Sequence, residues 1–222
     1  METVVNCFKK RPDAVARLIC FPWAGGGSIH YARWGNVLSS SVEGEVPRKH
    51  FTCTCLHVVA KAPRKPCMVL IPKIHNMEPV HIFLSGASAP YSETRIKTPK
   101  RSDLSDEDFL KWLISIGGTP PELLANPEVL KLFLPALKAD LHVVENYRCN
   151  KASSPLFSCP VTCFDGKDDI PHDLQAWKDI TSGDFTIKMF HGSHFYLKDS
   201  GNEKIILDYV TKHLETSEMD YL

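Results

Sequence analysis

The sequence has no excess of charge of either sign and no long hydrophobic run. Its 26 Lys and Arg residues balance its 26 Asp and Glu residues, which argues against a dedicated nucleic-acid binder or a polybasic membrane binder. No apolar run approaches the roughly 20 residues that cross a bilayer, so we expect no membrane span. Because the segment from Met1 to Pro12 has no apolar core of signal-peptide length, we expect a cytoplasmic protein.

The glycine and proline contents and the spacing of the cysteines exclude further classes of protein. The 12 Gly and 16 Pro among 222 residues are too few for a disordered or fibrous chain. The eight cysteines include no C-x2-C pair, and a chain of this length does not need a disulfide framework. We therefore expect reduced thiols, most of them buried, in a single domain over residues 1–222.

Two groups of residues could be interpreted as zinc sites, and we expect neither to bind metal. The first consists of His50, Cys53, Cys55 and His57. Zinc ligand pairs usually have two to four intervening residues, which these cysteines lack. The second is the pair His191 and His194, which lies in a short Gly-Ser turn without an evident carboxylate partner.

The order of apolar segments predicts an α/β domain. The predicted strands are 17–21, 80–84, 160–164 and 185–190, and the predicted helices are 31–38, 105–116, 127–147, 173–180 and 202–215. Strands that alternate with helices indicate a mostly parallel sheet with helices on both faces. Only helices are predicted in the insertion at about 91–147, so we expect it to form a lid over one end of the sheet.

One anomalous segment, at about 39–76, does not fit this alternation. It contains two candidate strands, 56–60 and 67–71, with Pro and basic residues between them and no helix of useful length. A crossover between parallel strands normally contains a helix. The local pattern and the expected fold therefore disagree over this segment.

Residue types used in nucleophilic catalysis follow two of the predicted strands. Asp168 and Asp169 follow the strand at 160–164, and His194 follows the strand at 185–190. An acid followed by a His is the order of α/β-hydrolase triads, in which a carboxylate orients the imidazole that takes a proton from the nucleophile. An Asp before a helix can also be an N-cap, and His194 can be a surface residue. The joint placement at neighbouring strand ends favours the catalytic interpretation.

A glycine-rich loop, Trp23 to Ser28, follows the first predicted strand. It lacks the G-x-G-x-x-G pattern, and no P-loop Lys follows it, which argues against a phosphate site. A backbone N–H at this point could supply half of an oxyanion hole. A plain structural turn is the alternative.

Longer motifs resemble the type II thioesterase family. They are LICFPWAGGGSIHYARWG (18–35), MEPVHIFLSGASAP (77–90), GGTPPELL (117–124), LKADLHVVENY (137–147), DLQAWKDITSG (173–183) and GSHFYL (192–197). The resemblance covers roughly residues 1–38 and 77–222. It implies an α/β-hydrolase fold in which the insertion at 91–147 is the lid that shapes an acyl-chain groove.

The resemblance also implies a function, that of a serine-type thioester hydrolase. The family hydrolyses the thioester between a fatty acyl chain and the phosphopantetheine arm of an acyl carrier protein, here that of fatty acid synthase, and its mammalian members release medium-chain free acids. It implies His194 as general base and Asp169 as the catalytic acid, with Asp168 a neighbour. It implies an oxyanion-hole amide from Trp23 or Ala24. No cofactor is expected, because thioester cleavage needs only a nucleophile and oxyanion support.

The sequence departs from the family at the nucleophile. The family's serine lies in a G-H-S-x-G elbow, and no G-x-S-x-G occurs in this chain. The anomalous segment at 39–76 stands where the elbow, its strand and a helix would be. Ser85 and Ser88 follow a strand without the elbow pattern. The thiols of Cys53, Cys55 and Cys67 have no evident place near the catalytic residues, so the sequence identifies no nucleophile.

Three explanations fit the anomalous segment. We favour a spliced or out-of-frame segment, because the flanking sequence matches the family and the change is abrupt at both ends. The alternative is an inactive family member that acts at most as a carrier-protein or acyl-chain binding module. A rewired active site is the third.

Overall fold

The computed structural model describes residues 5–7, 9–24, 29–47, 56–60, 79–117, 119 and 124–219. The strands are β1 (Val5–Cys7), β2 (Ala16–Phe21), β3 (Val42–Pro47), β4 (Leu56–Ala60), β5 (His81–Ser85), β6 (Val161–Gly166) and β7 (Phe185–Phe190). The helices are α1 (Ile29–Val37), α3 (Glu93–Lys97), α4 (Asp106–Ile116), α6 (Pro127–Asn146) and α7 (Ser200–Met219), and the 3-10 helices are η1 (Gln175–Ile180) and η2 (Tyr196–Lys198).

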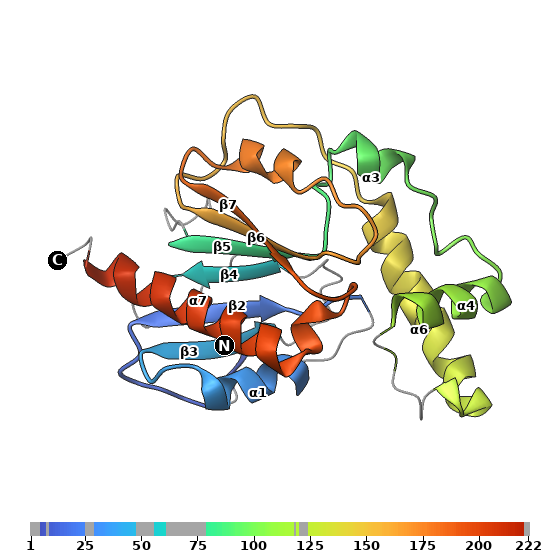
Figure 1. Ribbon diagram of the computed structural model, residues 1–222, viewed down its shortest axis with the longest axis horizontal. Coiled ribbons are helices and arrows are strands. Elements are labelled where there is room, and N and C mark those ends of the chain that lie inside the picture. The colour runs from blue at the N-terminus through green and yellow to red at the C-terminus, as the bar shows by residue number, and fades with distance from the viewer. Residues whose placement is uncertain are drawn as a thin grey trace.

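The strands form one sheet of order β1-β3-β2-β4-β5-β6-β7 (Figure 1). The β2–β3, β5–β6 and β6–β7 pairs are parallel. Strand β4 runs antiparallel to both of its neighbours, β2 and β5, and β1 runs antiparallel to β3. Most strands therefore share one direction, as the sequence predicted, and their carboxyl ends meet at one edge of the sheet.

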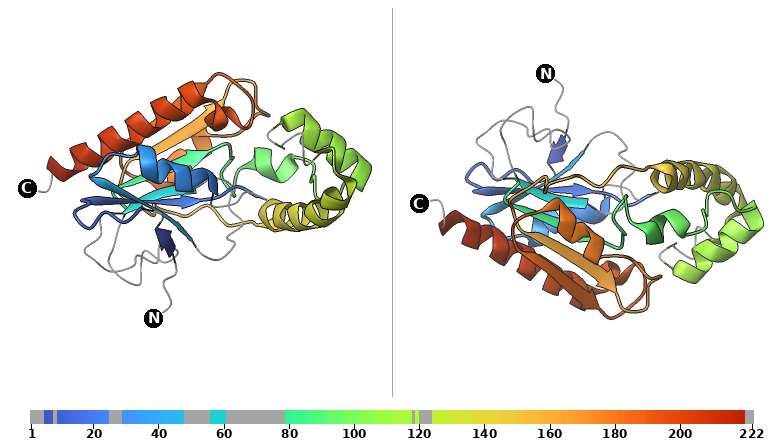
Figure 2. Two further views of the ribbon diagram at one scale, coloured as in Figure 1. Left: turned by 90° about the horizontal axis from the view of Figure 1, so that it is seen from below. Right: turned by 90° about the horizontal axis from the view of Figure 1, so that it is seen from above.

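Helices cover both faces of this sheet, and the alternation of side chains along β5 explains how. Phe83 packs into the hydrophobic cluster that holds Trp34 of α1 and Val210 of α7. Its neighbours along the strand, Ile82 and Leu84, pack into a second cluster with residues of β6 and η1. Successive side chains of a strand point to opposite faces. The edge-on views show α7 lying along one face (Figure 2).

The strongest apolar runs gave reliable predictions. The strands expected at 17–21, 80–84, 160–164 and 185–190 lie within two residues of β2, β5, β6 and β7. The segment expected to be helical at 173–180 is the 3-10 helix η1. The candidate strand at 56–60 is β4, and the candidate at 67–71 lies outside the described residues.

Strand β3 was missed, because its pattern is acidic. Glu43 and Glu45 alternate with small or apolar residues, yet their side chains are only 10% and 6% exposed. Arg17 on β2 lies 3.8 Å from Glu43 and 3.5 Å from Glu45, and the backbone N–H of Arg11 donates to Glu43. Pairing of this kind is what allows carboxylates to be buried. The anomalous segment predicted at 39–76 thus begins with an ordinary strand, which α1 connects to β2.

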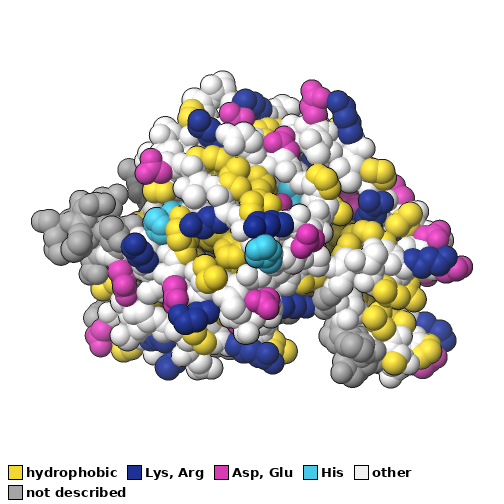
Figure 3. Space-filling model, in the orientation of Figure 1, with side chains coloured by type: hydrophobic (Ala, Val, Ile, Leu, Met, Phe, Trp, Pro, Cys, Tyr) yellow, Lys and Arg dark blue, Asp and Glu magenta, His cyan; other side chains and the backbone are white. Residues whose placement is uncertain are grey.

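The chain between β5 and β6 leaves the sheet and forms α3, α4 and α6. Helix α4 begins at Ser105, whose Oγ accepts a hydrogen bond from the Asp108 N–H at 3.1 Å, and ends at Gly117 with φ of +75°. Phe109 and Leu113 of α4 pack against Leu residues of α6 in a separate hydrophobic cluster. These helices form a lobe at one end of the molecule (Figures 1 and 3). The lobe therefore has a small core of its own.

Two further properties bear on the sequence analysis. Among the described residues no helix combines the length and the apolar character needed to cross a bilayer. No disulfide bond joins two of the five described cysteines; Cys20, Cys159 and Cys163 are buried, Cys7 is half-buried and Cys149 is exposed.

Candidate active site

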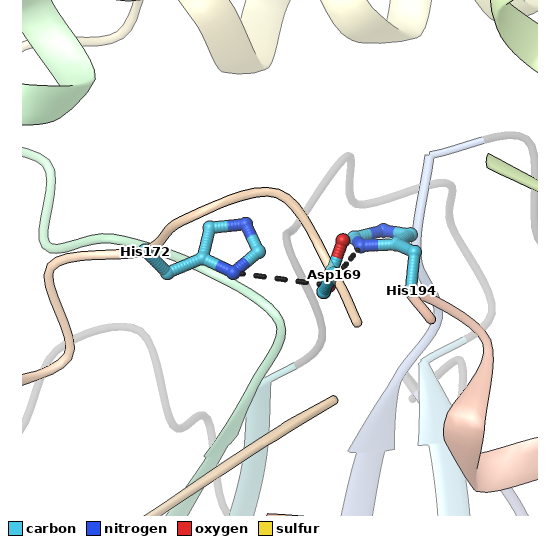
Figure 4. A group of neighbouring side chains, drawn as sticks. All are labelled: Asp169, His172 and His194. Carbon is cyan, nitrogen blue, oxygen red and sulfur yellow. Dashed lines mark hydrogen bonds and ion pairs between the residues drawn. The ribbon is translucent and has the colours of Figure 1, made fainter. Parts of the chain in front are cut away.

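The structure brings Asp169 and His194 together, although 25 positions separate them in the sequence. Asp169 follows β6 and His194 follows β7, and His194 Nδ1 lies 2.8 Å from Asp169 Oδ2 (Figure 4). The Asp169 side chain is 2% exposed and that of His194 is 29% exposed. A carboxylate in this position accepts the Nδ1 proton, so the other ring nitrogen, Nε2, is the one that can take a proton from a reacting group.

The pKa of Asp169 is consistent with a permanent carboxylate. Burial acts to raise this pKa, but the hydrogen bond from His194 and the charges of His194 and His172 outweigh burial and hold it below its ordinary value. The backbone N–H of Ile170 also donates to Asp169 Oδ1 at 2.7 Å. Hydrogen bonds to the charged form favour that form.

Asp168 has a different task from Asp169. It is exposed, and its Oδ2 accepts from the Gly192 N–H at 3.2 Å while its own N–H donates to the Gly192 carbonyl at 3.1 Å. Gly166, at the end of β6, lies very close to the loop after β7, which carries His194. A Cβ at this glycine would stand 2.4 Å from the Gly192 carbonyl oxygen. The loops that carry the acid and the histidine are thus fastened together.

Gly86 is a site residue whose role the sequence analysis missed. It follows β5 with φ of +59°, and a Cβ at this position would lie 3.3 Å from His194 Cε1. A positive φ is easy only for Gly. The Ser-Gly-Ala-Ser run directly after a buried strand was the available signal.

The two serines nearest to a strand end are engaged in hydrogen bonds of the fold. Ser85 Oγ lies 2.5 Å from the Tyr196 hydroxyl, and Ser88 Oγ accepts from the Asp173 N–H at 2.9 Å. Both serines are buried. Cys53, Cys55, Cys67 and His50 lie outside the described residues, and His57 lies in β4. Among the residues that the structure describes, the site geometry adds no nucleophile to those considered from the sequence.

The direction of β4 has a bearing on the missing elbow. Leu56, the first residue of β4, pairs with Phe21 at the end of β2 and with Leu84 near the end of β5. The amino end of β4, rather than its carboxyl end, therefore lies at the edge where Asp169 and His194 stand. A nucleophile elbow is a turn from a strand's carboxyl end into a helix. Strand β4 is not oriented to provide one at this edge.

A cavity of about 780 Å³ extends from this pair into the helical insertion. His172 and His194 line its polar end, and Trp112, Phe133 and Leu137 are among the side chains that line it from α4 and α6. The lining is mostly apolar, but the insertion also contributes charged side chains, among them Arg95, Arg101 and Glu145. A cavity that combines apolar walls with a few polar groups is typical of a small-molecule site.

Trp23 and Ala24 also line this cavity. The Trp23 ring makes edge-to-face contacts with Tyr31 and Phe195, both at 5.8 Å between centroids, which fix the start of the loop after β2. The rest of the glycine-rich loop, 25–28, lies outside the described residues. The two residues for which the sequence predicted an oxyanion-hole amide therefore face the same space as His194.

Three side chains of the site could offer ligand atoms to a metal ion. Asp169, His172 and His194 each contribute one donor atom, and these atoms lie within 4.8 Å of one another. The pair predicted from the sequence as a weak candidate, His191 and His194, is not this group: His191 is exposed, and His172 takes its place beside His194.

Comparison with known proteins agrees with this geometry. The model of the thioesterase domain family matches residues 74–214. The medium-chain S-acyl fatty acid synthase thioesterases of Rattus norvegicus and Homo sapiens are 37% and 35% identical to this chain; the alignments cover 98% and 97% of it and 95% and 94% of the relatives. The crystal structure of human thioesterase 2 is 31% identical, with a TM-score of 0.62, and the match covers 90% of this chain and 96% of that one.

The alignment with the rat protein has a further feature. It extends over 250 positions, whereas this chain has 222 residues. The relative therefore contains residues that have no counterpart in this chain. The alignment therefore contains gaps on the side of this chain.

Proposed function

The chain belongs to the thioesterase family, and from this premise we propose that it hydrolyses the thioester of fatty acyl groups carried by the acyl carrier protein of fatty acid synthase and releases medium-chain free acids. The observation that carries the proposal is the Asp169–His194 pair at the polar end of an apolar cavity. The names of the rat and human relatives supply the class of substrate.

In the proposed mechanism, His194 is the general base and acid and Asp169 orients it. His194 Nε2 takes the proton of a serine hydroxyl, which the family's mechanism implies and which neither the sequence nor the described residues identify. The acyl group passes to that oxygen, and the pantetheine thiol leaves with the proton that His194 returns. Water activated by the same imidazole then releases the acid. A backbone amide of Trp23 or Ala24 stabilises the oxyanion in both steps. The chemistry requires no cofactor.

The proposed lid is the insertion at 91–147. Its helices α4 and α6 supply the apolar lining in which an acyl chain would lie. The proposed partner is the carrier-protein domain, whose phosphopantetheine arm would deliver the thioester to His194. We place this activity in the cytoplasm.

The test is hydrolysis of decanoyl-acyl carrier protein by the full chain, with His194→Ala as the variant and His191→Ala as the matched control. We expect turnover by the wild type, a loss of about a thousandfold or more in His194→Ala, and no change in His191→Ala, since His191 is exposed.

Two outcomes would contradict the proposal. Equal rates in the wild type and His194→Ala would exclude the pair from the chemistry. No turnover by a folded wild type that still binds the acyl carrier protein would favour the binding module instead.

A further inference from the structure

A second histidine–aspartate pair stands beside the first. Asp165, in β6, is 3% exposed, and its Oδ2 lies 2.9 Å from Nδ1 of His172. The Asp165 carboxylate also accepts the Gly166 N–H at 3.0 Å. The His172 side chain is only 8% exposed. Neither residue has a part in the mechanism proposed for thioester hydrolysis.

His172 connects this buried carboxylate to Asp169. Its Nδ1 lies 3.8 Å from Asp169 Oδ2, the same oxygen that pairs with His194. The rings of His172 and His194 are 6.1 Å apart between centroids. Figure 4 shows the Asp169 carboxylate between the two imidazoles. The four side chains therefore form a continuous chain in the order Asp165, His172, Asp169, His194.

The arrangement has an electrostatic consequence for Asp169. Desolvation disfavours a buried carboxylate unless positive charge or hydrogen-bond donors compensate. The charge of His172 is one of the causes that keep the pKa of Asp169 low, after those that come from His194. Asp165 in turn fixes the His172 ring, because a carboxylate at Nδ1 determines which way the imidazole faces.

We propose that His172 is a positioning residue for the Asp169–His194 pair: it is held by Asp165 and keeps the Asp169 carboxylate aimed at His194. It acts through Asp169 and not on the reacting atoms. This inference deepens the proposed function and rests on it for its kinetic test only.

The kinetic test compares His172→Phe with His172→Asn. Phenylalanine fills the ring's space without a donor, whereas the Asn amide can place an N–H where Nδ1 stands. We expect His172→Phe to lower kcat about 10- to 100-fold, since small displacements of catalytic groups have effects of this size. KM should stay within about twofold, and His172→Asn should recover most of the loss. His191→Phe is the exposed control and should match the wild type.

A test without turnover uses the hydrogen bond itself. In proton NMR, the Nδ1 proton of His194, held between nitrogen and carboxylate, should give a downfield resonance in the wild type, His172→Asn and His191→Phe. It should be lost or displaced in His172→Phe. If His172→Phe fails to fold, Asp165→Asn replaces it, and the same resonance should be displaced.

These readouts separate two failures. If the wild type does not hydrolyse thioesters but the resonance depends on His172 as described, the proposed function is wrong and the positioning role stands. If thioesters are hydrolysed and folded His172→Phe keeps both the wild-type kcat and the wild-type resonance, the positioning role is wrong. Equal losses in His172→Phe and His172→Asn would also overturn it.

Discussion

The two halves of the sheet differ in how they meet the edge where the site lies. In the half formed by β5, β6 and β7, three parallel strands end at this edge, and each is followed by a residue of the site: Gly86, Asp169 and His194. In the half formed by β1 to β4, antiparallel pairs interrupt the order, and β4 brings its amino end to the edge.

The comparison teaches that the two halves of the sheet supply different parts of the candidate site. The β5–β7 half completes a histidine–carboxylate pair from its own loops. The other half contributes Trp23 and Ala24 after β2, while the orientation of β4 does not suit a strand-to-helix elbow. Substitutions on each side should therefore affect different properties of the protein.

The largest effect should come from Asp169→Asn, with the adjacent Asp168→Asn as its control. Losing the carboxylate that orients His194 should lower kcat by about two to four orders of magnitude. Asp168→Asn should retain most of the activity, since an amide oxygen can still accept from the Gly192 N–H. Steady-state kinetics on the acyl thioester measures kcat for both variants. A comparable loss in both variants would mean that the two aspartates share one role.

The next effect concerns stability on the β6–β7 side. In Gly166→Ala the new Cβ would stand 2.4 Å and 2.5 Å from the carbonyl oxygens of Gly192 and Ser193. Relieving such overlap with backbone should cost about 1–3 kcal/mol of unfolding free energy, or more. Gly35→Ala in α1 is the control, because among the described residues its Cβ would meet only Lys9, at the ordinary contact distance of 3.7 Å. Urea unfolding of both variants tests this, and equal stability would show that the loops can separate without cost.

The smallest expected effect is a difference in how the two halves of the sheet contribute to stability as the pH changes. Burial raises the pKa of Glu45 on β3; the charge of Arg17 opposes this and that of Glu43 adds to it. Ionised Glu45 therefore lowers the free energy of unfolding at pH 7. This destabilisation disappears as the pH falls towards 4.5, the ordinary pKa of a glutamate carboxyl. Asp169 affects stability in the opposite direction, because folding lowers its pKa. Its stabilising contribution to the free energy of unfolding is complete above pH 3.8, the ordinary pKa of an aspartate carboxyl, and is lost as the pH falls below that value.

The measurement is urea unfolding of the wild type and Glu45→Gln at pH 7 and pH 5. Glu45→Gln should be the more stable protein at pH 7, and its advantage should shrink at pH 5. An advantage that grows on acidification would mean that folding lowers the pKa of Glu45 rather than raising it.

The sequence predicted those elements whose pattern lies in neighbouring residues, and it missed those that depend on contacts between distant segments. Strands β2, β5, β6 and β7 are apolar runs, and Ser105 and Gly117 marked the ends of α4, so these elements were predictable from neighbouring residues. Strand β3 was not, because its buried Glu43 and Glu45 depend on Arg17 of another strand. The direction of β4 is set by pairing with β2 and β5, which no local pattern encodes.

The same distinction holds for the site. Asp169 and His194 each follow a strand end, and their proximity follows from the parallel order of β6 and β7. His172 escaped notice because its partner Asp165 lies within β6 and points to it only in the folded chain. Gly86 escaped notice because its contact is with a loop more than a hundred residues away.

The close approach of Gly166 to the Gly192 loop has a consequence for how such a protein can change over evolution or by design. Two loops joined this tightly cannot gain or lose residues independently, because either change would separate Asp169 from His194. The lobe of α4 and α6 has its own hydrophobic core and lies between β5 and β6 in the chain. Changes in the length or polarity of its part of the cavity can therefore be made without altering the two loops that hold Asp169 and His194.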